Sequence, residues 1–216
     1  MTDLQNQLQN LLQAPSENRD PNWENKFFNA LVNSNLSVLS ADPQIGPDNW
    51  PYLMTECNSE STESAQKIIH WLHDKGIGLV LNPTKDYPDY VFSYGMIWSF
   101  KETGYFYKTA DKIETGVVEI QKDAKCYYGA PSEQYLPTYV RRILKEFFLD
   151  QGLLHVKVLM LSMDNKHFDF AISLESLGNP PESEHEGIAE AISWFLPPHY
   201  SILLISEKNL PAFGDL

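Results

Sequence analysis

The chain has 216 residues and a mass of 24.7 kDa, which suffices for one large domain or two small ones. Hydrophobic residues make up 43% and aromatic residues 12% of it, a composition that indicates a folded protein and excludes an intrinsically disordered one. The formal net charge of −13 opposes binding to nucleic acid or anionic membranes, which are also negative, and leaves basic or cationic partners open.

The two cysteines, Cys57 and Cys126, form no CxxC motif, which argues against a disulfide framework and against a cysteine zinc site. Residues 1–12 lack the basic start and continuous apolar run of a signal peptide. No run reaches the about 18 apolar residues that a membrane span needs. We therefore expect reduced thiols, a cytoplasmic location and no membrane partner.

Three helices are predicted in the first 75 residues, because apolar residues recur there every three or four positions. Their ends carry local signals: Pro21 stands at the first position of the second helix, and Gly76 follows the third. The predicted helices cover residues 3–12, 20–32 and 62–75.

Short strands are predicted after the second and third of these helices. Residues 36–39, 77–81 and 90–92 are short runs rich in apolar or aromatic residues, which is typical of strands. The segment 40–62 is rich in Asp, Pro, Asn and Ser, and we expect it to form a long surface loop.

Most of the aromatic excess lies between Asp86 and Tyr107. A helix is predicted over 94–103, ending at Gly104. The segment either packs as core or forms an exposed apolar patch for protein binding, and its tyrosines outnumber what one helix or strand face can bury. We expect the patch, and the predicted binding residues are Tyr87, Tyr90, Tyr94, Tyr105 and Tyr107.

The final third has the clearest pattern. The predicted elements, after strand candidates at 117–121 and 125–128, are a helix at 136–151, strands at 155–162 and 168–174, a helix at 186–195 and a strand at 201–206. Counted from 125–128, the order is β-α-β-β-α-β, that of a ferredoxin-like sandwich. We therefore predict an α+β fold of two small mixed domains, residues 1–130 and 131–216, with the ferredoxin-like one at the C-terminus.

No coherent catalytic set stands out. The chain lacks the serine-hydrolase, zincin, P-loop and dinucleotide motifs. His70 and His73 are three apart on a predicted helix, but no third metal ligand is in register. His167 and Asp169 are two apart on a predicted strand, on the face that should look into water. His185 lies among glutamates at a helix start, where acidic residues are common. We predict no catalytic residue, no metal and no cofactor.

Two blocks of the sequence carry a family resemblance. One runs from Gly129 to Glu133, through the helix 136–151 and the strand residues Phe170 to Glu175, to the stretch 195–203. The other covers 8–39 and adds the strand that ends at 82–83. These blocks resemble the SseB, or enhanced serine sensitivity, family of bacterial proteins, mainly its C-terminal domain. The resemblance implies a bacterial protein with a non-catalytic role, because that family has no established catalytic residues.

We interpret the chain as a non-catalytic, cytoplasmic regulatory or adaptor-like protein that binds another protein. One alternative is a small acidic enzyme that uses His70, His73 or His167 with nearby carboxylates in a cleft between the domains. Another is an inhibitor or immunity-type protein whose acidic surface faces a basic target.

Overall fold

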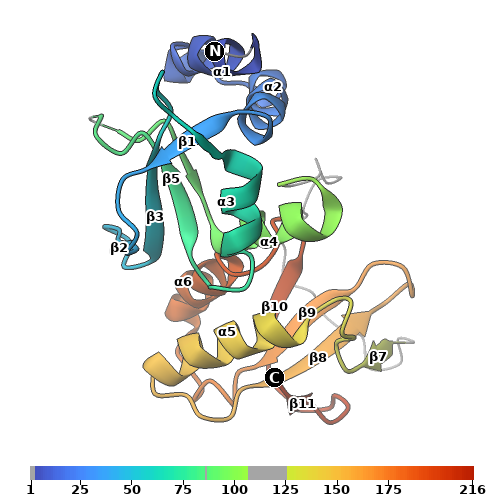
Figure 1. Cartoon of the computed structure of the whole chain (residues 1–216). Coiled ribbons are helices and arrows are strands. Elements are labelled where there is room, and N and C mark those ends of the chain that lie inside the picture. The colour runs from blue at the N-terminus through green and yellow to red at the C-terminus, as the bar shows by residue number, and fades with distance from the viewer. Residues whose placement is uncertain (1–2, 86, 107–125) are drawn as a thin grey trace. The chain divides into compact units, whose positions relative to one another are not determined.

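The computed structural model describes residues 3–85, 87–106 and 126–216, and it shows an α+β protein with helices and two mixed sheets (Figure 1). Contacts divide the chain into two compact units, Met1–Phe106 and Tyr107–Leu216. The strand β7 (Tyr127–Gly129) pairs with β8 (Lys157–Ser162) and thus belongs to the second unit, so the predicted boundary after residue 130 lies too late in the chain. Long-range strand pairing decides to which unit β7 belongs, and the local composition around residue 130 does not reveal this pairing.

Local sequence signals fix several ends in the first unit. Its elements are α1 (Asp3–Leu12), η1 (Ser16–Asn18), α2 (Pro21–Val32), β1 (Asn35–Val38), β2 (Gln44–Ile45), β3 (Pro51–Glu56), β4 (Glu63–Ser64), α3 (Ala65–Leu72), β5 (Gly78–Leu81), β6 (Tyr90–Phe92) and α4 (Tyr94–Thr103). The Asp20 side chain caps α2 by accepting a hydrogen bond from the Trp23 N–H at 2.7 Å. Gly104 ends α4 in the left-handed region, with φ of 78°.

The strand β3 is the main departure from prediction in this unit. We expected residues 40–62 to form a surface loop, and this is wrong for β3, which lies inside the sheet between β1 and β5. Tyr52 and Leu53 of this strand are buried. The strand order is β4-β1-β3-β5-β6, with β2 paired to β3 and β5 running parallel to β3. Pairing on both edges thus outweighs the polar composition of the surrounding segment.

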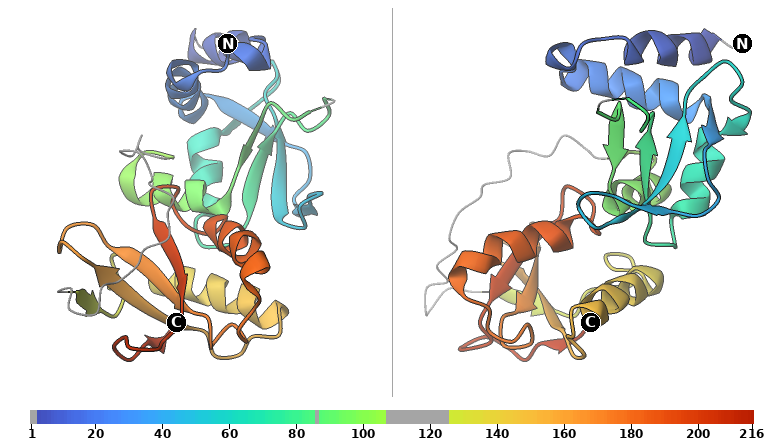
Figure 2. Two further views of the ribbon diagram at one scale, coloured as in Figure 1. Left: turned by 180° about the vertical axis from the view of Figure 1, so that it is seen from behind. Right: turned by 90° about the vertical axis from the view of Figure 1, so that its left-hand side faces the viewer.

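Aromatic rings form much of the first unit's core. Phe106 lies within ring contact of Phe28, Phe92 and Phe100, with centroids 4.7–4.8 Å apart. These rings join α2, β6 and α4, while α1 lies along α2 (Figure 2). For these aromatic side chains of the segment 86–107, the structure thus supports the core alternative and not the interface alternative.

The second unit has the predicted order of elements but not the expected ferredoxin-like sheet, which is not confirmed. Its elements are β7, α5 (Thr138–Asp150), β8, β9 (Asp169–Ser173), α6 (Glu182–Ser193), β10 (Ser201–Ile205) and β11 (Gly214–Asp215). A split βαβ unit would place a strand between β9 and β10, but these two pair directly and in parallel. β8 pairs with β9 on one edge and with β7 and β11 on the other.

Both faces of this sheet are covered in part. Helices α5 and α6 lie on the same side of it (Figure 2). On the side that carries Leu159, Leu161 and Ala171, Phe213 packs against the sheet shortly before β11. The strand predicted at 117–121 lies outside the described residues.

Candidate functional site

A large groove lies at one end of the second unit's sheet, where β8 ends and where β9 and β10 begin. Its volume is about 1270 Å³. Its walls come from β7 and the following loop, from the β8–β9 hairpin and from the start of β10. Five aromatic residues and one aspartate are among the residues that line it: Tyr127, Tyr128, Tyr135, Phe168, Tyr200 and Asp169.

Sheet register brings parts of this groove together. Tyr128 on β7 pairs with Leu161 on β8, Leu161 pairs with Asp169 on β9, and Asp169 pairs with Ser201 on β10. Directly paired residues point to the same face of a sheet. Tyr128 and Asp169 therefore share one face, although they are 41 positions apart in sequence. Gly129 and Met160, which also line the groove, lie on the opposite face, so the groove spans the end of the sheet.

Two tyrosines form a fixed stack in the groove wall. The rings of Tyr135 and Tyr200 lie 4.3 Å apart at 22°, and the Tyr200 hydroxyl donates a hydrogen bond to the Tyr135 carbonyl at 2.7 Å. The His199 ring meets Tyr200 edge-on, with centroids 5.0 Å apart. This wall is therefore held in place before any ligand binds, which lowers the entropic cost of binding.

Two polar groups in the groove have no side-chain partner. The buried Tyr135 hydroxyl has no hydrogen-bond partner among the described residues. The half-buried Asp169 carboxylate has neither a hydrogen bond nor an ion pair in the part of the chain that the structure describes. Burial raises the pKa of Tyr135, and the neighbouring Tyr200 and Asp169 raise it further. A buried hydroxyl without a partner costs about 1–3 kcal/mol, so the groove is incomplete by itself.

His167 pairs with Asp164 rather than with Asp169. Its Nδ1 lies 2.6 Å from the Asp164 carboxylate, which also accepts hydrogen bonds from the N–H groups of Lys166 and His167 at 2.8 Å. These contacts, led by the His167 N–H, hold the pKa of Asp164 well below its usual range. The pair lies in an exposed turn before β9, and its hydrogen bonds shape that turn.

The predicted tyrosines of the first unit fall into different environments. Tyr94 is fully buried, and its hydroxyl donates a hydrogen bond to the His73 carbonyl at 2.5 Å. Tyr90 is partly buried, and its hydroxyl donates to the Glu24 carboxylate. Burial and the Glu24 charge raise the pKa of Tyr90. Tyr94 is therefore a core residue and does not belong to an exposed patch.

Tyr87 and Tyr105 are the exposed members of this predicted set among the described residues. Their side chains are 85% and 60% exposed, respectively. Tyr107 lies outside the described residues. A binding role for Tyr87 and Tyr105 stays a prediction, since two exposed rings do not by themselves define a surface.

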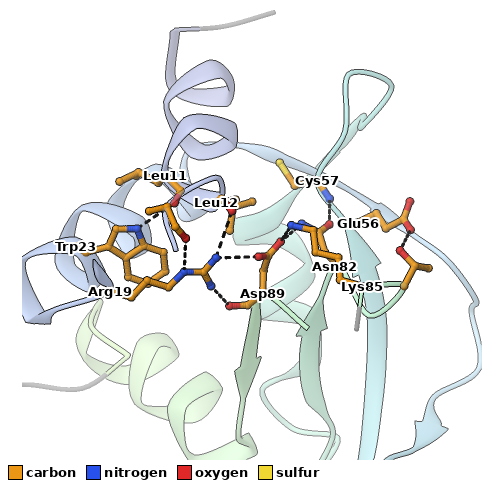
Figure 3. A network of polar contacts seen from close by, with 11 residues as sticks. Leu11, Leu12, Arg19, Trp23, Glu56, Cys57, Asn82, Lys85 and Asp89 are labelled. Atoms are coloured by element: carbon orange, nitrogen blue, oxygen red, sulfur yellow. Dashed lines mark hydrogen bonds and ion pairs between the residues drawn. The ribbon is translucent and has the colours of Figure 1, made fainter. Parts of the chain in front are cut away.

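A polar network in the first unit joins its N-terminal helices to the sheet (Figure 3). The Arg19 guanidinium contacts the Asp89 carboxylate at 3.0 Å and donates to the Asp89 carbonyl at 2.7 Å. It also lies over the Trp23 ring, 4.8 Å from the centroid. Asn82 donates to the same carboxylate at 2.7 Å, and Lys85 forms an ion pair with it. Every oxygen of Asp89 is thus engaged.

Electrostatics in this network follow from that arrangement. Burial works to raise the pKa of Asp89, but the hydrogen bonds from Asn82, Lys85 and Arg19 outweigh it, and the pKa lies below its usual value. Nearby, burial and the Asp89 charge raise the pKa of Cys57 to about 11. The Cys57 thiol is therefore protonated at neutral pH and is a poor nucleophile.

The histidines that the sequence singled out as possible metal ligands gather no further ligands. His73 Nδ1 lies 2.7 Å from the His70 carbonyl on α3. Within residues 3–85, 87–106 and 126–216, no group of three or more His, Cys, Asp or Glu side chains is placed to hold a metal. Over the same ranges, no helix is long and apolar enough to cross a membrane.

Sequence reasoning missed most of the groove. Tyr127 and Tyr128 lay in a predicted strand, Tyr135 before a predicted helix and Tyr200 after two prolines, so nothing local linked them. The sequence offered one signal, which is that each of these aromatic residues stands at or beside the end of a predicted element. No family model, curated protein or solved structure matches this chain.

Proposed function

We propose that this protein is a non-catalytic binding module of regulatory or adaptor type, and that the groove of its second unit receives a segment of a partner protein. The supporting observation is the groove itself, with a volume of about 1270 Å³ and aromatic walls. Pockets for small molecules typically have about 300–1,000 Å³, so this groove favours an extended segment. Tyrosine and phenylalanine are also enriched at protein interfaces.

The polar groups of the groove support binding rather than catalysis. General acid–base chemistry needs a group whose pKa lies near the working pH and a partner within hydrogen-bond reach. The raised pKa of Tyr135 keeps its hydroxyl protonated, and the carboxylate of Asp164 is committed to its own turn. These groups suit recognition of a ligand better than proton transfer.

We further propose that the chain is a cytoplasmic bacterial relative of the SseB family. The support is the sequence resemblance, two parts of which border the groove. Gly129 belongs to the first of these parts, and Tyr200 and Ser201 belong to the part at 195–203. A role as a binding protein agrees with a family to which no catalytic residues are assigned.

A pair of glycine substitutions tests the groove. Gly129 lines it, Gly187 lies on α6 away from it, and a Cβ added at either position meets no described atom within 4 Å. Gly129→Trp should therefore fill the groove without disturbing the fold, and Gly187→Trp is the matched control. Melting temperatures within a few degrees of wild type will verify folding.

The readout is selection of binders from a random peptide library against the full chain. We expect enriched peptides that bind wild type and Gly187→Trp with equal affinity and lose binding to Gly129→Trp. Equal binding to Gly129→Trp would place the site elsewhere. A selection that yields no binders would contradict the proposed function altogether.

A further inference from the structure

We propose that the partner segment received by the groove continues along the free edge of β10 and adds a strand to the sheet of the second unit. This inference rests on the proposed function and deepens it, since it names the conformation and the charge of that segment. It follows from three observations: an edge strand without protection, backbone groups that point away from the sheet, and an acidic helix that packs on the same strand.

β10 is an edge strand that lacks the features by which sheets usually protect an edge. It lies at one end of the strand order β10-β9-β8-β11. Its five residues, Ser201–Ile205, include no proline and no charged side chain, and each of them is partly exposed. The other strands with a single described strand partner, β2, β4, β6, β7 and β11, have only two or three residues each. Short strands, charges and prolines prevent pairing at an edge, so β10 is the edge that can accept another strand.

The direction of the β10 backbone groups follows from its pairing with β9. The two strands run parallel. The Ile205 carbonyl accepts a hydrogen bond from the Leu174 N–H at 3.0 Å, so Ile205 turns its backbone groups toward β9. Backbone groups of successive strand residues point to opposite sides, so Leu203 also faces β9, while Ile202 and Leu204 turn their groups outward.

The N–H and C=O groups of Ile202 and Leu204 form a row of four hydrogen-bonding groups at the free edge. No hydrogen bond joins them to a residue in the part of the chain that the structure describes. An extended chain presents its own N–H and C=O groups at the same two-residue spacing, so it can pair with this row. A helix satisfies its backbone groups internally and cannot. The edge therefore selects an extended segment.

This edge begins at the groove. Ser201 is the first residue of β10, and both it and Tyr200 before it line the groove. The four residues that follow Ser201 are all Ile or Leu. Cross-strand neighbours of such side chains are favourable when they are β-branched or aromatic, so we expect residues such as Val, Ile or Thr in the added strand.

Helix α6 indicates the charge that should flank the added strand. It packs against β10 and contains no Lys or Arg. Its four glutamates, Glu182, Glu184, Glu186 and Glu190, are all exposed, and His185 is its one other titratable residue. Complementary charge therefore favours lysine or arginine on both sides of the paired residues.

A second copy of this chain fits the edge less well than a basic segment does. Two β10 strands paired antiparallel about a twofold axis would place both α6 helices on the same side of the joined sheet. Four glutamates of one copy would then lie on the same side as four of the other. Such like charges oppose association, so we assign the edge to a partner protein.

The test is hydrogen-exchange NMR of the full chain with the peptide acetyl-Lys-Lys-Val-Thr-Val-Thr-Val-Lys-Lys-amide, since Val and Thr favour strands. Without peptide, the amide protons of Ile202 and Leu204 should exchange at least about tenfold faster than those of Leu203 and Ile205, which are bonded to β9. With peptide, exchange at Ile202 and Leu204 should slow by at least about tenfold, because both amides gain a hydrogen bond. Slow exchange there without peptide, or no slowing with it, would overturn the inference.

Two control peptides distinguish backbone pairing from unspecific contact. The first carries N-methyl groups on its central valine and on the next threonine, which removes one N–H from each edge of the strand. It should bind at least about tenfold more weakly. The second carries glutamate in place of lysine and should bind several-fold more weakly, with a difference that shrinks as salt is added. Binding of either control as tight as that of the lysine peptide would contradict the proposal.

Variants and oligomeric state complete the test. Replacing all four α6 glutamates by glutamine should weaken the lysine peptide several-fold, while an unchanged melting temperature verifies folding. Unchanged affinity would refute the role of α6. A dimer in analytical ultracentrifugation whose formation slows exchange at Ile202 and Leu204 would assign the edge to a second copy and overturn the inference.

The outcome also separates this inference from the proposed function. Peptides selected against the full chain that lose binding to Gly129→Trp but leave exchange at Ile202 and Leu204 unchanged would refute strand addition and leave the groove function standing. Selected peptides that slow this exchange and bind Gly129→Trp as tightly as wild type would refute the groove function and confine binding to the edge.

Discussion

Asp89 in the first unit and Asp169 in the second are both withdrawn from solvent, but their carboxylates have very different surroundings. The Asp89 side chain is 4% exposed and is contacted by Arg19, Lys85 and Asn82. The half-buried Asp169 side chain has no hydrogen bond or ion pair among the described residues. The Asp89 carboxylate is therefore fully engaged within the fold, whereas no described residue engages the Asp169 carboxylate.

The comparison indicates which of the two carboxylates stabilises the fold. Figure 3 shows the Asp89 network linking the N-terminal helices to β5 and β6, where each partner lies within the same unit. Removing one member of a buried ion pair leaves the others unpaired and costs stability. Removing an unpaired acid relieves a desolvation cost instead. Removal of Asp89 should therefore destabilise the fold, and removal of Asp169 should not.

The largest expected effect is on stability. Asp89→Ala should lower the free energy of unfolding by about 3–5 kcal/mol, because it leaves the Arg19 guanidinium without its carboxylate. Asp169→Ala should change it by no more than about 0.5 kcal/mol, or raise it. Urea unfolding followed by circular dichroism measures both. Equal destabilisation by the two substitutions would break the comparison.

A smaller effect distinguishes two buried hydroxyls in the same way. The Tyr94 hydroxyl donates to the His73 carbonyl, whereas the Tyr135 hydroxyl has no partner among the described residues. Tyr94→Phe should cost about 0.5–1.5 kcal/mol, the usual net value of one hydrogen bond, and Tyr135→Phe should cost nothing. Thermal unfolding of both variants checks this. A loss for Tyr135→Phe as large as that for Tyr94→Phe would show that the Tyr135 hydroxyl is satisfied.

The smallest effect concerns pH. Because the pKa of Asp89 is lower in the folded chain, its contribution to stability is complete above the unfolded value of about 3.9 and is lost as the pH falls toward the folded value. Stability measured by urea unfolding should therefore decline between about pH 5 and about pH 3. Asp89→Asn should make that decline shallower. An unchanged slope would mean that Asp89 titrates alike in both states.

Local signals made several elements predictable. Asp20 and Pro21 mark the start of α2, and Gly104 marks the end of α4, because capping depends on residues within one turn. The α+β class also followed from the alternation of patterns. By contrast, β3 was missed because it is defined by its neighbours in the sheet, which the surrounding polar residues do not reveal.

The candidate site was less predictable than the fold. Tyr94 and Tyr105 look alike in sequence, but one packs in the core and the other is exposed, a difference set by tertiary contacts. The groove arises where β7, β8, β9 and β10 meet, and sheet register places Tyr128 and Asp169 on one face and Gly129 and Met160 on the other. Strand order and register depend on long-range pairing, so composition and periodicity could not bring these residues together.

The central claim is that the groove of the second unit receives a segment of a partner protein. The most direct measurement is the affinity of wild type, Gly129→Trp and Gly187→Trp for peptides selected against the full chain. We predict that Gly129→Trp, which places a large side chain in the groove, loses binding and that Gly187→Trp keeps it. Equal binding to all three proteins would contradict the claim, because the peptides would then bind outside the groove.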